Sequence, residues 1–269
     1  MANSINTNAG ALVALQNLNN TSRDLSITQN RVNTGMKVSS AKDNGAIFAI
    51  ATNQRAEMGA LDAVKQSMQR GQSIVDVALA AGETITKALE EQKSLAVAIE
   101  SSVAGSAAET AYLADFNALG NEITKALAGA TFDGVNLYSA AAADVEVKTG
   151  TGSTDKFVLK ATGAATAVAT AGGAIVRAGA TATAVDTALK AFTAELGALG
   201  TKSKSLERSL TFTGKIQDAV EVGIGNLVDA DLAKESAKLT ALQTKQQLGV
   251  QALGIANQSS SVLLGLFRG

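Results

Sequence analysis

The stretch LDAVKQSMQRGQSIVDVALAAGETITKALEEQKSLAVAIESSV, residues 61–103, decides the fold. Apolar residues and glycines recur along it at alternating steps of three and four, the spacing of a helix that packs against other helices along one side. The positions on this line are Leu61, Val64, Met68, Gly71, Val75, Ala78, Gly82, Ile85, Leu89, Gln92, Ala96, Ile99 and Val103. Only Gln92 among them is polar. At about 1.5 Å per residue, the segment predicts a helical rod of roughly 60 Å.

Further helices are expected on the C-terminal side of this rod. Residues 107–128 place Tyr112, Phe116, Leu119, Ile123 and Leu127 on one side of a helix. Another helix is expected from near residue 180 to near residue 225, with a break around residues 197–200, where two glycines weaken it. The chain contains no proline, which suits long uninterrupted helices.

The segment between these helices has a different character. Asp133 and Gly134 form a hairpin-turn pair, and residues 144–161 alternate valine with charge, turn through glycines and resume with apolar residues. Residues 161–179 read as a loop or a weak strand. The sequence therefore predicts a mainly α fold: long antiparallel helices in a coiled-coil-like bundle, with a small β-hairpin insert in the middle of the chain.

Composition excludes several classes of function. The chain has no Cys and no His, so a thiol nucleophile, a disulfide, an ordinary zinc site and a histidine general base are all ruled out. Gly214-Lys215 lacks the other residues of a phosphate loop, and the carboxylates of residues 229–235 lack a calcium-loop glycine. We therefore expect neither an enzyme nor a cofactor. The net charge of −1 implies no general attraction to nucleic acid.

Both ends of the chain are uncharged. The first charge is Arg23, and no charged residue stands between Lys245 and Arg268. The C-terminal stretch is rich in Gln, Asn and Ser, which argues against membrane insertion. The N-terminal stretch has no basic region followed by a compact apolar one, so we expect no cleavable signal peptide.

The two ends have helical periodicity. Ile5, Ala9 and Leu12 are followed by a heptad line, and three lines with gaps of seven run through the C-terminal segment. The N-terminal line is Leu18, Leu25 and Val32; the C-terminal lines are Leu232, Leu239, Gln246 and Leu253, then Leu242, Gly249, Ala256 and Leu263, then Leu248, Ile255 and Val262. The ends could pair inside one globule. Alternatively, they pair and bury the remaining apolar surface against other copies of the chain.

Short motifs at both ends carry a family resemblance. SINTNAGALVALQNLN at residues 4–19 has an S-I-x-T-N run followed by spaced Ala and Leu, residues 31–35 have R-x-x-[ST]-G, and residues 40–43 have S-A-K-D. Near the C-terminus, Asp229, Asp231, Ala233 and Glu235 form a D-x-D-x-A-x-E element, and A-N-Q at 256–258 precedes a Leu-rich finish at 263–267. Together these elements resemble the ends of bacterial flagellins, in the same order.

The resemblance implies a structural subunit of the flagellar filament, of a short, thin-filament type without large outer domains. It implies an inner core domain of residues 1–43 and 226–269, and an outer helical domain of residues 44–225 with a β-hairpin element at about 131–177. The terminal helices would line the centre of an extracellular helical tube that serves as a propeller for swimming. The inner-core assembly residues are expected to be Ile5, Leu12, Leu18, Leu25, Val32, Leu239, Leu242, Leu253, Ile255, Leu263, Leu264 and Phe267.

The resemblance also implies partners. They are other copies of the chain and close paralogues, the flagellar export apparatus, a secretion chaperone, and the filament cap and hook-junction proteins. Two other classes compete with this interpretation. A coiled-coil adaptor would need soluble, charged ends, and an enzyme grafted on a filament subunit would need an inserted domain.

One motif departs from the family pattern. Many flagellins carry Q-R-V-R-E-L-A-V-Q, which an innate immune receptor reads, and here the matching residues 90–98 are EEQKSLAVA. Glu91 and Ser94 stand at the first Arg and the Glu positions, and Lys93 stands at the second Arg, whereas Leu95 is retained. The charge reversal predicts weak recognition by that receptor. Ordinary drift of a helix surface would leave the same residues.

Overall fold

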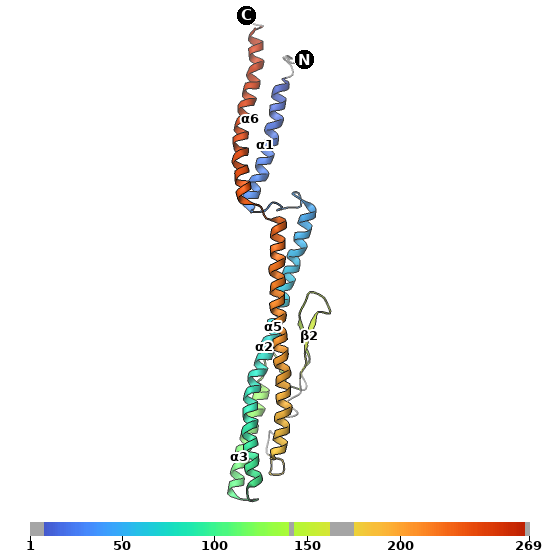
Figure 1. Cartoon of the computed structure of the whole chain (residues 1–269), viewed down its shortest axis with the longest axis vertical. Coiled ribbons are helices and arrows are strands. Elements are labelled where there is room, and N and C mark those ends of the chain that lie inside the picture. Colours follow the sequence, from blue (N-terminus) through green and yellow to red (C-terminus); the bar gives the residue numbers. More distant parts are fainter. Residues whose placement is uncertain (1–7, 140–142, 162–174, 267–269) are drawn as a thin grey trace. The chain divides into compact units, whose positions relative to one another are not determined.

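The computed structural model describes residues 8–139, 143–161 and 175–266, with side chains described as far as residue 258. Its elements are α1 (Ala9–Thr34), α2 (Gly45–Ser101), α3 (Ala107–Gly129), β1 (Val145–Lys148), β2 (Lys156–Leu159), α5 (Ala182–Val228) and α6 (Leu232–Leu266) (Figure 1). The mainly α fold with one small hairpin in the middle of the chain is confirmed.

The chain divides into two compact units, residues 1–56 with 219–269 and residues 57–218. The border between these units falls inside helices α2 and α5. The predicted domain border lies at 43/44, in the turn between α1 and α2, and at 225/226, in the last turn of α5, and it remains a proposal.

The heptad line of residues 61–103 forms one side of α2, and that side is the core of unit 57–218. Every residue on the line from Leu61 to Ile99 is buried, including the polar Gln92. The Gln92 side-chain amide donates to the Phe116 carbonyl oxygen of α3 at 2.9 Å, which satisfies a polar group in the core. Val103 is 78% exposed because α2 ends at Ser101. The predicted rod is therefore confirmed up to its last turn.

Helices α3 and α5 supply the other sides of this core. Phe116 and Ile123 of α3 are almost fully buried, as are Phe192, Leu199 and Leu206 of α5. The predicted break around residues 197–200 is wrong, because α5 is continuous from Ala182 to Val228. A helical glycine costs about 1 kcal/mol relative to alanine. Burial of the apolar side chains around it, at about 1.5–3 kcal/mol each, outweighs that cost.

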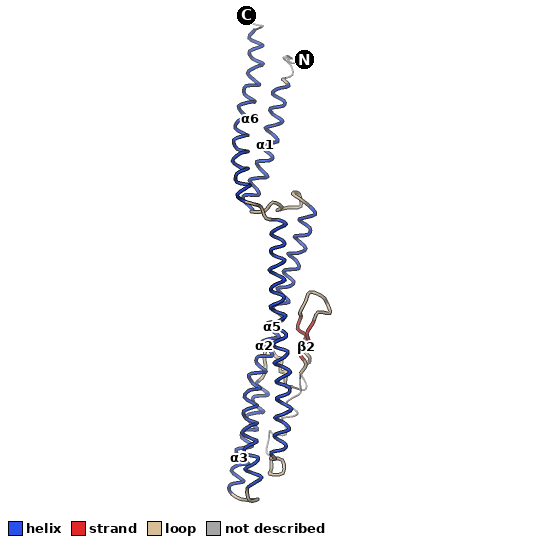
Figure 2. The backbone as a smooth tube through the Cα atoms, viewed as in Figure 1, coloured by secondary structure: helices blue, strands red, loops and turns tan. Residues whose placement is uncertain are grey.

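The β insert packs on α2 at two glycines. Its two strands are drawn in red in Figure 2. β1 and β2 pair antiparallel with Val147 opposite Phe157, and Val147 is buried. A Cβ on Gly71 would lie 2.5 Å from a Val147 methyl group, so only glycine admits this contact. In the same way Gly82 makes room for Tyr138, whose hydroxyl donates to the Ala78 carbonyl oxygen.

The predicted turn at Asp133-Gly134 is confirmed. Both residues have positive φ, 51° and 75°, and Phe132 and Val135 exchange two backbone hydrogen bonds of 2.9 Å across them. Within the expected β region at about 131–177, the described strands are only β1 and β2. Residues 162–174, expected as a loop or weak strand, lie outside the described residues.

Candidate assembly surface

Helices α1 and α6 lie side by side and form an antiparallel pair (Figure 1). The residues that face across the pair are the less exposed ones of each helix, and they recur at alternating steps of three and four. We call them the seam; they are Ala11, Ala14, Leu18, Thr21, Leu25, Thr28 and Val32 of α1, and Glu235, Leu239, Leu242, Gln246, Gly249, Leu253 and Ala256 of α6. The predicted pairing of the two ends is therefore present within one chain.

Polar contacts fix the register of the seam along its length. Near the start of α1, the Asn8 side-chain amide donates to the Ala256 carbonyl oxygen at 2.7 Å, and its side-chain oxygen caps α1 by accepting from the Ala11 N–H at 3.0 Å. At the other end of the pair, the Arg31 guanidinium and the Glu235 carboxylate form an ion pair at 3.2 Å. These contacts link positions more than 200 residues apart in the sequence.

The turns at the base of the pair explain several family motifs. Gly35 ends α1 in the left-handed conformation, with φ of 70°, and its carbonyl oxygen accepts from the Ala230 N–H at 2.9 Å. The Lys37 N–H donates in return to the Val228 carbonyl oxygen at 2.7 Å. Asp231 begins α6 by accepting from the Lys234 N–H at 3.1 Å. The two linkers are therefore held to each other by backbone bonds.

Asp43 organises the turn before α2. One of its carboxylate oxygens accepts from the backbone N–H and the hydroxyl of both Ser39 and Ser40, at 2.9–3.1 Å. These hydrogen bonds, with the Ser39 N–H contributing most, hold the pKa of Asp43 below its ordinary value. Asn44 then caps α2 by accepting from the Ile47 N–H at 3.1 Å. The sequence analysis had matched the S-A-K-D element to a family without assigning it this role.

Outside the seam, both helices carry large apolar side chains that are exposed in the single chain. They are Leu12, Val13, Leu15 and Ile27 of α1, and Leu232, Leu248, Val250 and Ile255 of α6. Ile255 is 69% exposed. Side chains 8–22 and 246–258 include no charged group. A single chain thus leaves large apolar side chains in water on an uncharged surface, which marks an interaction site.

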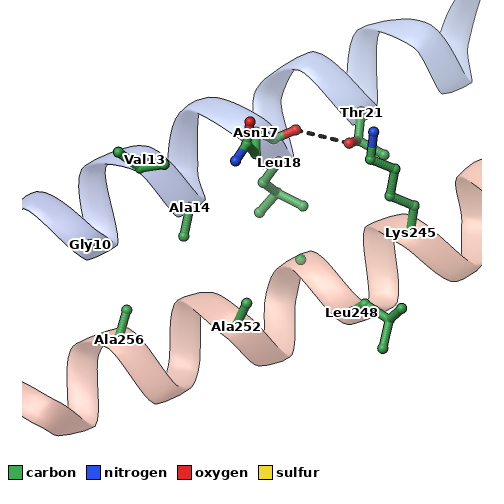
Figure 3. A pocket seen from close by; sticks show the side chains of 11 residues that line it. Gly10, Val13, Ala14, Asn17, Leu18, Thr21, Lys245, Leu248, Ala252 and Ala256 are labelled. Atoms are coloured by element: carbon green, nitrogen blue, oxygen red, sulfur yellow. Dashed lines mark hydrogen bonds between the residues drawn. The ribbon is translucent and has the colours of Figure 1, made fainter.

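A groove of about 430 Å³ runs along one face of the pair (Figure 3). Ala14 and Leu18 of α1 point toward Ala252 and Ala256 of α6, and small side chains keep the groove open. Gly249 lies at its floor, where an added Cβ would be 3.3 Å from a Leu18 methyl group.

The predicted assembly residues fall into three positions. Leu25 and Leu242 are buried in the seam, and Leu18, Val32, Leu239 and Leu253 are half-buried there. Leu12 and Ile255 are exposed on outer faces. Leu263 and Leu264 belong to α6, but their side chains, like all of Ile5 and Phe267, lie outside the described part of the chain.

The sequence analysis missed some exposed residues of this surface. Val13, Leu15 and Val250 lie off the heptad lines that it followed, so they were assigned to no face. The available signal was their size on helices with almost no charge.

The residues of the altered immune-receptor motif separate into two groups. Glu91, Ser94 and Leu95 line a groove of about 490 Å³ together with residues of α3. Lys93 instead forms an ion pair with Asp186 of α5 at 2.5 Å. Among the described residues, no helix is long and apolar enough to cross a membrane, and no cluster of three His, Cys, Asp or Glu side chains could hold a metal ion.

Both ends of the chain match protein families that are already known. Residues 5–143 match the bacterial flagellin N-terminal helical region, and residues 182–267 match the bacterial flagellin C-terminal helical region. Flagellin FljM of Caulobacter vibrioides is 51% identical over 280 residues, with 99% of each chain covered. Flagellin FljK of the same organism is 50% identical over 282 residues, and a flagellin of Brucella melitensis is 36% identical over 285 residues, each with 99% of both chains covered.

Matches over nearly the full length also confirm that the chain has no large outer domain. Flagellins are structural proteins and not enzymes, and they assemble with further copies of themselves and with paralogues. The chain belongs to the bacterial flagellin family and is a structural subunit of the flagellar filament that drives motility.

Proposed function

We propose that α1 and α6 form the inner core of the filament tube, with residues 1–43 and 226–269 as an inner domain and residues 44–225 outside it. One observation carries this proposal: the seam occupies only one side of each helix, and the exposed remainder carries large apolar side chains and no charge over residues 8–22 and 246–258. Burying one such side chain contributes about 1.5–3 kcal/mol before ordering costs. Neighbouring copies of the chain can cover the exposed sides of both helices.

The proposal includes the predicted assembly residues in two roles. Leu18, Leu25, Val32, Leu239, Leu242 and Leu253 pair the helices within one copy, and Leu12 and Ile255 contact other copies. Ile5, Leu263, Leu264 and Phe267 are proposed for the same core on the sequence pattern alone. The flagellar export apparatus, a secretion chaperone, and the cap and hook-junction proteins are further proposed partners, supported by the family relationship.

Seeded growth tests the inner-core proposal. Purified full-length chain is added to sheared filaments and the pelleted mass is followed with time. Ile255→Lys places a charge on the outer face of α6 and should abolish growth, because a buried unpaired charge is costly. Val103→Lys is the matched control, because Val103 of unit 57–218 is also largely exposed, at 78%, and this variant should grow like the parent.

Circular dichroism should show the same helix content for both variants, since neither residue is buried in the single chain. Growth of Ile255→Lys at the parental rate would refute the inner-core assignment. A parent that never extends seeds, under any condition, would instead favour the adaptor interpretation.

We also propose that the chain is weakly recognised by the immune receptor that reads the family motif. Glu91 and Ser94 are exposed with reversed or lost charge, and Lys93 is engaged by Asp186. In a receptor reporter assay with monomer, the parent should respond weakly and the double variant Glu91→Arg/Ser94→Glu more strongly. A full parental response would contradict the proposal, and Glu122→Arg/Asn121→Glu on α3 is the control.

A further inference from the structure

The groove of about 490 Å³ between α2 and α3 is lined by both apolar and acidic residues. Leu95 and Leu119 are half-buried and pack on the core, and Ala118 lies beside them. Glu91 and Asp115 also line the groove, and both are exposed. Neither has an ion-pair partner among the residues that the structure describes. The groove therefore fits an apolar group flanked by positive charge.

Helix α5 presents a group of that kind. Phe212 is 65% exposed, more than any other phenylalanine in the described ranges, in a chain with only 3% aromatic residues. Arg208 precedes it by one helical turn and Lys215 follows it by one, so both lie on the same side of the helix. Both are exposed, and no described carboxylate pairs with them. An exposed aromatic ring beside arginine is typical of the centre of a protein interface.

The Phe212 side chain cannot reach the groove of its own chain. The Lys93–Asp186 ion pair places the groove residues of α2 level with Asp186 on α5. Phe212 lies further along the same continuous helix by roughly 40 Å, at about 1.5 Å per residue. The two complementary surfaces are therefore available only between different copies of the chain.

We propose that Phe212, flanked by Arg208 and Lys215, inserts into the Leu95–Leu119 groove of a second copy, where Glu91 and Asp115 meet the two basic side chains. The two copies use different surfaces, so the contact is heterologous and its repetition builds an open array. Neighbouring copies joined in this way are offset by roughly 40 Å along their α5 helices. The inference rests on self-assembly and adds a second contact, separate from the α1/α6 surface.

Complementary charge reversal tests the pairing in seeded growth. One full-length variant carries Glu91→Lys/Asp115→Lys and the other carries Arg208→Glu/Lys215→Glu. Each alone should extend seeds at least tenfold more slowly than the parent, because like charges then meet in the groove. An equimolar mixture should recover growth, since each copy now meets its opposite. Glu122→Lys, an exposed reversal on α3, should leave growth unchanged.

Phe212→Ala removes the ring without touching the core and should also slow growth, with unchanged helix content by circular dichroism. Parental growth of both charge variants, or a mixture that stays as slow as its components, would overturn the pairing. These outcomes are distinguishable from failure of the inner-core proposal, because Ile255→Lys would still abolish growth if only the groove contact is wrong.

Discussion

Unit 57–218 and the α1/α6 pair differ in how much of their apolar surface is buried within a single chain. In unit 57–218, the largest apolar side chains, such as Tyr138, Phe116 and Met68, are fully buried within one chain. In the described part of α1 and α6, Leu25 and Leu242 are the only buried large apolar side chains, and eight others are exposed. The first region completes its core alone, whereas the second has apolar surface left for other copies. The stability of the single chain should therefore depend on the two regions unequally.

Leu89→Ala against Leu242→Ala is the strongest test of this difference. Leu89 is fully buried between helices of unit 57–218, so its truncation leaves a cavity and should cost about 2–5 kcal/mol of unfolding free energy. Leu242 faces only one neighbouring helix, and its truncation should cost the monomer about 1–2 kcal/mol. Urea unfolding followed by circular dichroism measures both costs. Equal costs would show that the pair is as complete a core as the rest.

Gly82→Ala against Gly197→Ala tests how the β insert is held. A Cβ on Gly82 would lie 2.7 Å from the Tyr138 hydroxyl and 2.8 Å from a Leu196 methyl group, so overpacking should cost about 1–3 kcal/mol. Nothing lies within 4 Å of a Cβ on Gly197. There, the higher helix propensity of alanine should stabilise α5 by about 0.5–1 kcal/mol. Thermal unfolding of the monomer should shift in opposite directions, and a shared direction would refute the close packing.

The same residues show how much the sequence could predict. The line from Leu61 to Ile99 could be recognised in the sequence because one face of the helix is buried against several neighbouring elements. Apolar residues on that face therefore recur with a strict helical period. Gly71 and Gly82 belonged to the line, but the reason for glycine there was not visible, since Val147 and Tyr138 reach them only through the tertiary fold. The false break at residues 197–200 came from weighing local propensity above packing.

On the candidate assembly surface, the pattern identified the helices but not all of their faces. Leu12 was expected among the inner-core residues together with Leu18, yet the seam passes through Ala11 and Ala14, and Leu12 is exposed outside it. When apolar residues surround a helix, the periodicity does not distinguish the side that pairs within the chain from the sides left for other copies. The turn built by Asp43 was also hidden, because its four hydrogen bonds involve ordinary serines.

Tyr138→Phe tests the core of unit 57–218 with a smaller change, because it removes one hydroxyl group and keeps the ring. Loss of the hydrogen bond to the Ala78 carbonyl should cost about 1 kcal/mol near neutral pH. Burial raises the pKa of Tyr138 to about 12, above the ordinary value of 10.0. Because the neutral form is favoured in the folded state, this group's contribution is complete below pH 10 and is lost as the pH rises toward 12.

The difference between parent and Tyr138→Phe should therefore shrink across pH 10–12. Measuring both proteins at each pH removes the titration of lysines and of Tyr112 from the comparison. A difference that stays constant up to pH 12 would mean that the hydroxyl is not protected by folding.

Asp186→Asn should have the smallest effect on stability of these variants. It tests how much the ion pairs of Asp186 contribute to unit 57–218. Asp186 binds Lys190 at 2.7 Å and Lys93 at 2.5 Å, and these hydrogen bonds, that of Lys190 first, lower its pKa to about 2. A lowered pKa stabilises the fold above the ordinary value of 3.8, and the contribution is lost as the pH falls from about 4 to about 2. The melting temperature of Asp186→Asn should lie slightly below that of the parent at pH 7 and meet it near pH 2.

High salt should reduce the difference in melting temperature at pH 7, because the two ion pairs of Asp186 are partly exposed and are screened by salt. We call residues 8–22 and 246–258 of the α1/α6 pair the tip. The tip has no charged side chain, so its stability should not show a comparable dependence on pH or on salt. Protection from hydrogen exchange of the amides of residues 9–22 and 246–258, measured on the monomer at pH 7 in low and high salt, should therefore change less than that of α2 amides near Lys93. A larger salt response at the tip would mean that charge, and not the missing apolar neighbours, limits the order of the ends.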